Sequence, residues 1–154
     1  MEYDSYCSLT EAELARRDIA EINLAAASGL RGAEGLDIAA CLARLDEWAE
    51  LVEASTERWW PKFVRSPEES GGSAAQFRIM AMITVLQRSL GVSYNPASMT
   101  GPYNATDSRT HFIHGPLTGF GGTCVSLPVL YLAIGRRLNY PLKLVEAKEH
   151  YFAR

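Results

Sequence analysis

Cys124 follows the segment Gly121-Gly122-Thr123 and opens a very apolar stretch whose spacing predicts a helix. The N-terminus of a helix carries a partial positive charge and several free N–H groups. These groups favour the thiolate, which is the nucleophilic form of cysteine, and they can bind a developing oxyanion. Glycines before the helix let a substrate backbone come close. We therefore expect Gly121, Gly122 and Thr123 to form a substrate and oxyanion region, with Cys124 as the nucleophile.

A candidate base for this cysteine is His150, which lies near the end of a stretch with partial apolar and polar alternation. Such alternation predicts a strand. A helix, a tight turn and a strand packing back on the helix can bring the imidazole to the start of that helix. A cysteine and a histidine in contact supply a nucleophile and a general base. The spacing alone is a weak pattern, because three cysteines and three histidines form nine such pairs.

The stretch 112–154, which includes G-F-G-G-T-C before the expected helix and A-K-E-H-Y-F in the expected strand, resembles the transglutaminase-like superfamily. It looks most like the bacterial branch whose domain often precedes tetratricopeptide repeats. The upstream pieces E-I-N-L-A-A-A-S-G-L (21–30) and G-V-S-Y-N-P (91–96) are similar to the same branch. The resemblance implies a papain-like core in which Cys124 attacks an amide or ester carbonyl and His150 is the base.

In that superfamily an Asp or a similar residue on a later strand orients the histidine, and here no acidic residue follows His150. The resemblance therefore leads us to expect a domain that is incomplete at its C-terminus, or a short form with impaired chemistry. Losing an orienting residue can cost orders of magnitude in rate. Asp107, Asn104 and Asn139 are candidates to replace it, and the sequence favours none of them.

The leading functional hypothesis is cysteine-dependent acyl chemistry, hydrolysis or transfer, on an amide bond of a protein or peptide through a Cys124–His150 dyad. It needs no cofactor. The alternative is a non-catalytic regulatory or protein-binding module on the same fold, so whether the chain is an active enzyme stays open. No metal site is expected, because His111 and His114 lack the Glu and the i, i+4 spacing of a zinc protease. His114 is expected either to line the cleft or to pin the loop before it.

Composition limits the remaining classes of function. The 154 residues suit one domain, and the net charge of 15 − 18 = −3 argues against a nucleic-acid or anionic-membrane footprint. No stretch is long and apolar enough for a membrane span, and the N-terminus does not have the pattern of a signal peptide. Three widely spaced cysteines predict free thiols in a reducing cytoplasm. Cys41 is expected in the core, and Cys7 near the surface.

Helix signals dominate the chain, and we expect an α-rich α+β fold. A capping box at Thr10 predicts a helix that ends at Gly29, and Asp37 caps a second helix that ends near Pro61. Segment 66–73 is predicted to be a linker between a helical part, 1–65, and a core, 74–154, within one domain 1–154. A third helix is expected over 73–90, with an inner face of Phe77, Met80, Ala81 and Thr84.

The C-terminal part of the chain should position the dyad. A long connection over 92–122 precedes the helix that carries Cys124, which is predicted over 124–138 and should be central and buried. A short antiparallel strand or two is expected at the C-terminal end, with residues 142–152 as a strand candidate. An exposed apolar strand edge recruits another chain. We therefore expect a homodimer or another strand-mediated contact through this edge.

Overall fold

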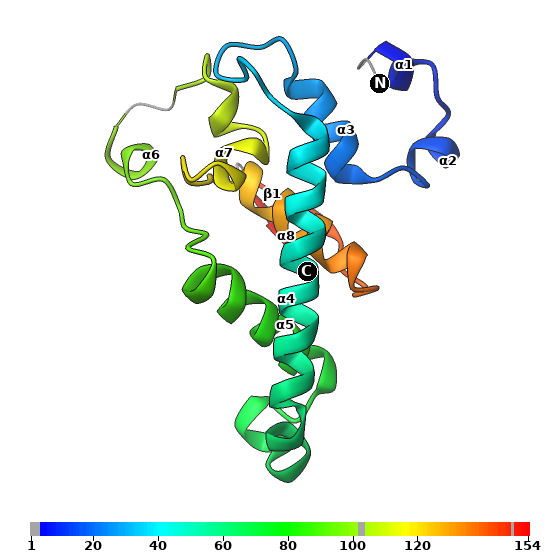
Figure 1. The fold of residues 1–154 in the computed structure, drawn as a ribbon, viewed down its shortest axis with the longest axis vertical. Helices are drawn as coiled ribbons and strands as arrows, with labels where there is room; N and C mark the ends of the chain where they lie inside the picture. The colour runs from blue at the N-terminus through cyan, green and yellow to red at the C-terminus, as the bar shows by residue number, and fades with distance from the viewer. Residues whose placement is uncertain (1–3, 102–103, 149) are drawn as a thin grey trace.

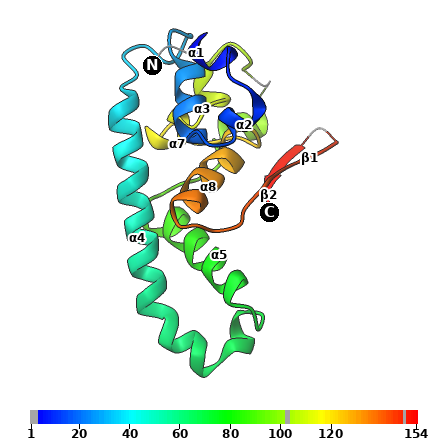
Figure 2. The same cartoon turned by 90° about the vertical axis from the view of Figure 1, so that its right-hand side faces the viewer.

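The chain folds into a helix-rich body with one short antiparallel hairpin at its C-terminal end (Figures 1 and 2). The structure is a computed structural model and describes residues 4–101, 104–148 and 150–154. The expectation of an α-rich α+β fold is confirmed. The α-helices are α1 (Asp4–Cys7), α2 (Glu11–Leu14), α3 (Ile19–Ala27), α4 (Ile38–Arg65), α5 (Ala74–Thr84), α6 (Ala97–Thr100), α7 (His114–Leu117) and α8 (Ser126–Arg137). The other elements are two 3-10 turns, η1 (Pro67–Ser70) and η3 (Ser108–Thr110), and the π-helical turn η2 (Val85–Ser89). The two strands are β1 (Leu144–Ala147) and β2 (His150–Ala153).

Helix α8 lies at the centre of the fold, as its apolar sequence predicts. It packs against α3, α4, α7 and β2. Four of its apolar side chains are at most 2 % exposed: Leu130, Leu132, Ala133 and Ile134. Figure 2 shows α8 crossing between the long helix α4 and the hairpin. A buried helix held on several sides provides a rigid base for whatever stands at its N-terminus.

The C-terminal end of α8 is fixed by Arg137, whose side chain is 16 % exposed. Its Nη2 donates to Asp18 Oδ2 at 2.8 Å, and its Nε donates to Asp46 Oδ1 at 2.6 Å. Asp18 precedes α3 and Asp46 lies on α4, so one guanidinium joins three helices. A cation here also suits the negative end of the helix dipole.

The expected first helix is wrong in its continuity, although its capping box at Thr10 and Glu13 is present. The chain leaves the helix after Leu14 and starts again at Ile19. Asp18 is the reason, because its Oδ1 accepts from the Ala20 N–H at 2.8 Å as an N-cap. The bond from Asp18 to Arg137 fixes that cap in place.

The second helix begins as predicted, with Asp37 as its N-cap, but its expected end near Pro61 is wrong. Helix α4 continues through Pro61 to Arg65. Pro61 has no N–H to donate to the carbonyl of Glu57, so one helical hydrogen bond is lost. Glu57 is exposed, and water can donate to its carbonyl instead. Phe63 in the last turn stacks on Phe77 of α5, with ring centroids 4.9 Å apart. This tertiary contact stabilises the turn beyond the proline.

Segment 66–73 forms a tight connection between α4 and α5, built from η1 and a glycine pair with positive φ. The two helices run antiparallel and pack on each other (Figures 1 and 2). Residues on both sides of the connection belong to one hydrophobic cluster. On α5, Phe77 and Ala81 are buried as expected. Met80 is 52 % exposed, and Met82 takes the inner position instead.

Of the one or two short antiparallel strands expected at the C-terminal end, the structure has two, because the chain reverses within the strand candidate 142–152. Strands β1 and β2 pair antiparallel, with Leu144 opposite Ala153 and Ala147 opposite His150. The hairpin projects away from the helices in Figure 2, while β2 packs against α8. Within the described residues, no helix combines the length and the hydropathy of a membrane span.

Candidate functional site

The start of α8 is built around Thr123, which is 1 % exposed. Its Oγ1 accepts from the N–H groups of Val125 and Ser126 at 3.2 and 3.4 Å and donates to the Thr110 carbonyl at 2.6 Å. Ser126 Oγ in turn accepts from the Thr123 N–H at 2.9 Å. These reciprocal bonds resemble a capping box. The helix predicted over 124–138 begins at Ser126, and Cys124 lies in the turn that precedes α8.

The glycine pair before this turn is held by the segment 93–95. The Gly122 N–H donates to the Ser93 carbonyl at 2.9 Å, and the Gly122 carbonyl accepts from the Asn95 N–H at 2.8 Å. Gly121 has φ +88°, and a Cβ there would lie 2.9 Å from the Asn95 Cα. Glycine is thus required here both for its backbone conformation and for a close approach of two chain segments.

Cys124 and His150 line the same pocket, which has a volume of about 370 Å³. We call it the Cys124 pocket. It lies between α5 with η2, the start of α8, and β2, and Tyr94 also borders it. Most of its wall is apolar, and the main contributors are Ile79, Met82, Ile83, Leu127, Tyr131 and Phe152. The two expected catalytic residues therefore share one cavity, and Thr123 lines it with them.

Within the described residues, no hydrogen bond joins the Cys124 thiol to the His150 ring. The thiol is partly exposed, and His150 is an exposed first residue of β2. The N–H of Cys124 likewise has no partner among the hydrogen bonds of the described residues. Pro128 lacks the N–H that would otherwise bond to the Cys124 carbonyl. Catalytic hydrogen bonds are often long without substrate.

The π-helical turn η2 places a polar residue on the opposite wall of the pocket, which the sequence did not predict. Gln87 Nε2 donates to the Tyr131 hydroxyl of α8 at 3.2 Å. Burial raises the pKa of the Tyr131 phenol, and the bond from Gln87 opposes this in part. Single π-turns inside helices occur often at functional sites. Neither residue type at this spacing gives a recognisable sequence signal.

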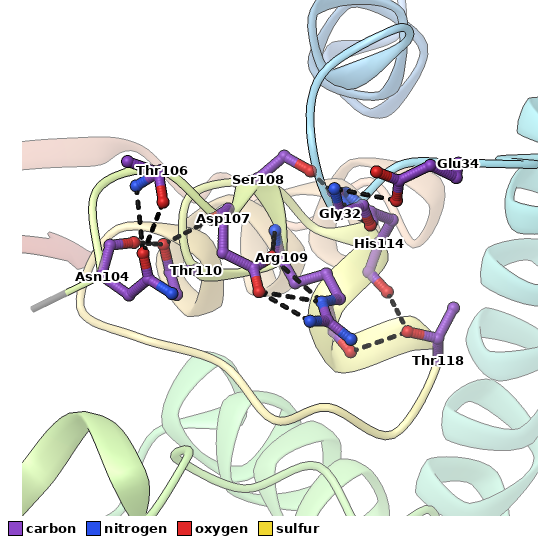
Figure 3. Close-up of polar contacts among 11 residues, drawn as sticks. Gly32, Glu34, Asn104, Thr106, Asp107, Ser108, Arg109, Thr110, His114 and Thr118 are labelled. Carbon is purple, nitrogen blue, oxygen red and sulfur yellow. Dashed lines mark hydrogen bonds and ion pairs between the residues drawn. The ribbon is translucent and has the colours of Figure 1, made fainter.

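The expectation that His114 belongs to the Cys124 region is wrong. The ring is 3 % exposed and lines a separate pocket beside the loop that joins α3 and α4. Its Nε2 lies 3.2 Å from Ser108 Oγ and 3.3 Å from the Gly32 carbonyl (Figure 3). A carbonyl only accepts, so Nε2 carries the proton, and the buried Nδ1 has no partner within the described residues. His114 therefore pins the loop, which was the other expectation.

None of the three candidate orienting residues lines the Cys124 pocket. Asp107 accepts from the Arg109 guanidinium at 2.6 Å, and these bonds lower the pKa of its carboxyl (Figure 3). Asn104 accepts from Thr106 at 2.9 Å. Asn139 has a φ of +55° in the turn after α8 and borders a different pocket. All three have local roles in loops.

Acidification should destabilise the protein through His114. Burial lowers the pKa of this ring below its ordinary value of 6.5, opposed in part by the Gly32 carbonyl and Asp107. At pH values between the lowered pKa of the folded state and the ordinary pKa of the unfolded state, the unfolded chain binds more protons than the folded one. The free energy of unfolding therefore falls as pH falls below about 6.5. Urea unfolding at several pH values would measure this. His114→Gln should flatten the dependence, and an unchanged slope would contradict it. Asp107 contributes only at lower pH, because its pKa is lowered from 3.8.

The remaining cysteines lie where the sequence predicted, with Cys41 buried and Cys7 exposed. In residues 4–101, 104–148 and 150–154, no group of three or more His, Cys, Asp or Glu side chains is arranged to hold a metal ion. Comparisons with family models, curated proteins and solved structures found no match to this chain. The site must therefore be interpreted from its own residues.

Proposed function

We propose that the protein performs cysteine-dependent acyl chemistry on an amide bond, hydrolysis or transfer, on a transglutaminase-like, papain-like core. The observation that carries the proposal is the shared pocket, in which Cys124 in the turn before α8 and His150 on β2 line one cavity. Two further features support it. The N–H of Cys124 has no hydrogen-bond partner within the described residues, and the cap made by Thr123 fixes the turn that carries it.

The reaction follows from these groups. His150 takes the thiol proton while Sγ of Cys124 forms a bond to the carbonyl carbon, and the carbonyl oxygen becomes an oxyanion. The Cys124 N–H is the candidate donor to that oxyanion. The C–N bond then breaks, and the leaving amine takes the proton from His150, which leaves a thioester. Water or a second amine attacks the thioester, and the thiol is restored. A hydrogen bond between Cys124 and His150 must form for the first step.

The first test is the alkylation of Cys124 by iodoacetamide, followed by intact mass and peptide mapping. A general base contributes roughly 10²- to 10⁴-fold. We therefore expect His150→Ala to slow Cys124 alkylation near neutral pH by at least tenfold on this basis. The exposed Cys7 is an internal reference, since it lies outside the Cys124 pocket. Equal Cys124 rates in both proteins would mean that the dyad does not assemble.

A second candidate function is protein binding, and the hairpin favours it. Leu144, Tyr151 and Phe152 are 37 to 40 % exposed, which is unusual for large apolar side chains on so small an element. Exposed strand edges pair with other chains. We propose a second copy of this chain as the partner.

The homodimer predicts a sedimentation coefficient that rises with protein concentration. Leu144→Lys should abolish the rise, because it places a charge on the hairpin and does not alter a residue of the Cys124 pocket. Met99→Lys is the control, since Met99 is 71 % exposed on α6, away from the hairpin. A monomer at every concentration would contradict the homodimer.

A further inference from the structure

We propose that the Cys124 pocket selects an acyl group with an apolar rather than a cationic side chain, and that Ile83 on α5 helps to set this selection. The inference rests on the proposed function, since the bond to Cys124 is what places the acyl group. It concerns the wall of the pocket rather than the dyad. A substrate carbonyl at Sγ would direct its adjacent side chain toward the wall formed by α5 and α8.

The size and composition of the pocket favour one apolar group. Its volume of about 370 Å³ lies near the lower end of the roughly 300–1,000 Å³ that small-molecule pockets span. Its apolar lining comes from three elements, with Ile79 and Ile83 on α5, Leu127 on α8 and Phe152 on β2. A side chain of the size of leucine or phenylalanine gains free energy by leaving water in such a place.

The charges around the pocket point the same way. No Asp or Glu is among the described residues that line it. The polar side chains in its wall are largely committed, because Gln87 donates to Tyr131 and Thr123 holds the start of α8. The exposed Arg154 also lines the pocket, so a carboxylate that entered has a counter-charge there. An ammonium group that entered beside Ile79 and Ile83 would lose water without a carboxylate to pair with, which is costly. Cationic acyl groups are therefore disfavoured.

A series of chloromethyl ketones tests this selection on the full chain, because each carries its side chain on the carbon next to the carbonyl, as an acyl group does. Sγ of Cys124 forms a bond to the CH₂ carbon, the C–Cl bond breaks, chloride leaves, and the thiol proton passes to His150 or to solvent. The series consists of the chloromethyl ketones of N-acetylated leucine, phenylalanine, glutamic acid and lysine. Each Cys124 rate is divided by the rate at Cys7, which corrects for the reactivity of the probe. We expect the two apolar probes to react at least about tenfold faster than the lysine probe.

Variants of α5 assign the selection to Ile83. Ile83→Lys places a cation in the half-buried wall and should raise the rate of the glutamic acid probe while lowering that of the leucine probe. Met80→Lys is the matched control, because Met80 lies on the same helix, is 52 % exposed and does not line this pocket. Ile83→Ala, which enlarges the cavity without a charge, should favour phenylalanine over leucine. If circular dichroism shows that Ile83→Lys does not fold, Ile83→Ala is the variant that tests the role of Ile83.

The outcomes separate this inference from the proposed function. Selectivity that persists while the rates do not depend on His150 upholds the pocket preference and contradicts the dyad. Rates that depend on His150 but are alike for all four probes contradict the pocket preference and leave the dyad standing. Equal effects of Ile83→Lys and Met80→Lys would also overturn the assignment to Ile83.

Discussion

Replacing His150 with alanine is expected to slow the acylation of Cys124 by p-nitrophenyl acetate by about 10²- to 10⁴-fold, the range that a positioned general base contributes. In this reaction Sγ forms a bond to the acetyl carbon, p-nitrophenolate leaves, and His150 accepts the thiol proton. The measurement is the release of p-nitrophenolate, combined with the mass of the acetylated peptide that contains Cys124. Cys124→Ala should form no adduct in that peptide.

The control for this prediction is His111→Ala, which removes a histidine outside the Cys124 pocket. Its Nε2 lies 3.2 Å from the Ala105 carbonyl in the loop before α7. A change outside the pocket does not alter contacts of the transition state, so His111→Ala should leave the acylation rate within about twofold. If His111→Ala and His150→Ala slow the reaction equally, the effect is structural and the dyad is contradicted.

The sequence predicted the helical core well because the pattern there is strong and local. The apolar run of α8 and the cap at Asp37 are local signals within the helices they mark, and the structure has them. The break before α3 was missed, since the capping residue Asp18 competes with a long run of good helix formers. What decides the outcome there is Arg137, which lies 119 residues further along the chain. No local pattern contains that contact.

Contacts outside the local sequence also explain why the end of α4 and the position of the hairpin turn were not predicted. A proline normally ends a helix. Here Phe63, beyond the proline, packs on Phe77 of the next helix, and the sequence around Pro61 does not reveal that contact. In residues 142–152 the alternation predicts extended backbone correctly, and both strands are extended. It does not specify where the chain reverses, because pairing Ala147 with His150 needs a turn for which the local sequence gives no clear glycine or proline signal.

The candidate site was predicted only in part. The glycine pair, Thr123 and Cys124 are consecutive, so their placement follows from the start of one helix. That His150 reaches the same pocket depends on how β2 packs against α8, and the resemblance to a superfamily suggested it where spacing alone did not. The wall formed by α5 and η2 was not predicted, since Ile83 and Gln87 have the pattern of ordinary helix residues. In the structure Ile83 of α5 lines the pocket, and Gln87 of η2 donates to Tyr131.

Replacing Gly121 with alanine should disable the site through the backbone. Gly121 and Gly119 have nearly the same φ, +88° and +85°, and alanine in this left-handed region costs about 1–2 kcal/mol at either position. At Gly119 the added Cβ meets nothing within 4 Å, whereas at Gly121 it lies 2.9 Å from the Asn95 Cα. Gly121→Ala should therefore lose about 1–3 kcal/mol more in urea unfolding, the cost of overpacking a close contact.

Gly121→Ala and Gly119→Ala should also differ in the rate at which Cys124 is acylated. Gly121 directly precedes Gly122, whose backbone is hydrogen-bonded to Ser93 and Asn95. Pushing these segments apart strains the bonds of Gly122 and moves Thr123, whose Oγ1 holds the first turn of α8 and thus Cys124. Gly121→Ala should slow acylation of Cys124, while Gly119→Ala should leave it close to that of the unchanged chain. Equal losses of stability and rate would mean that φ alone matters here. The contact between the glycine pair and segment 93–95 would then have no part in positioning the thiol.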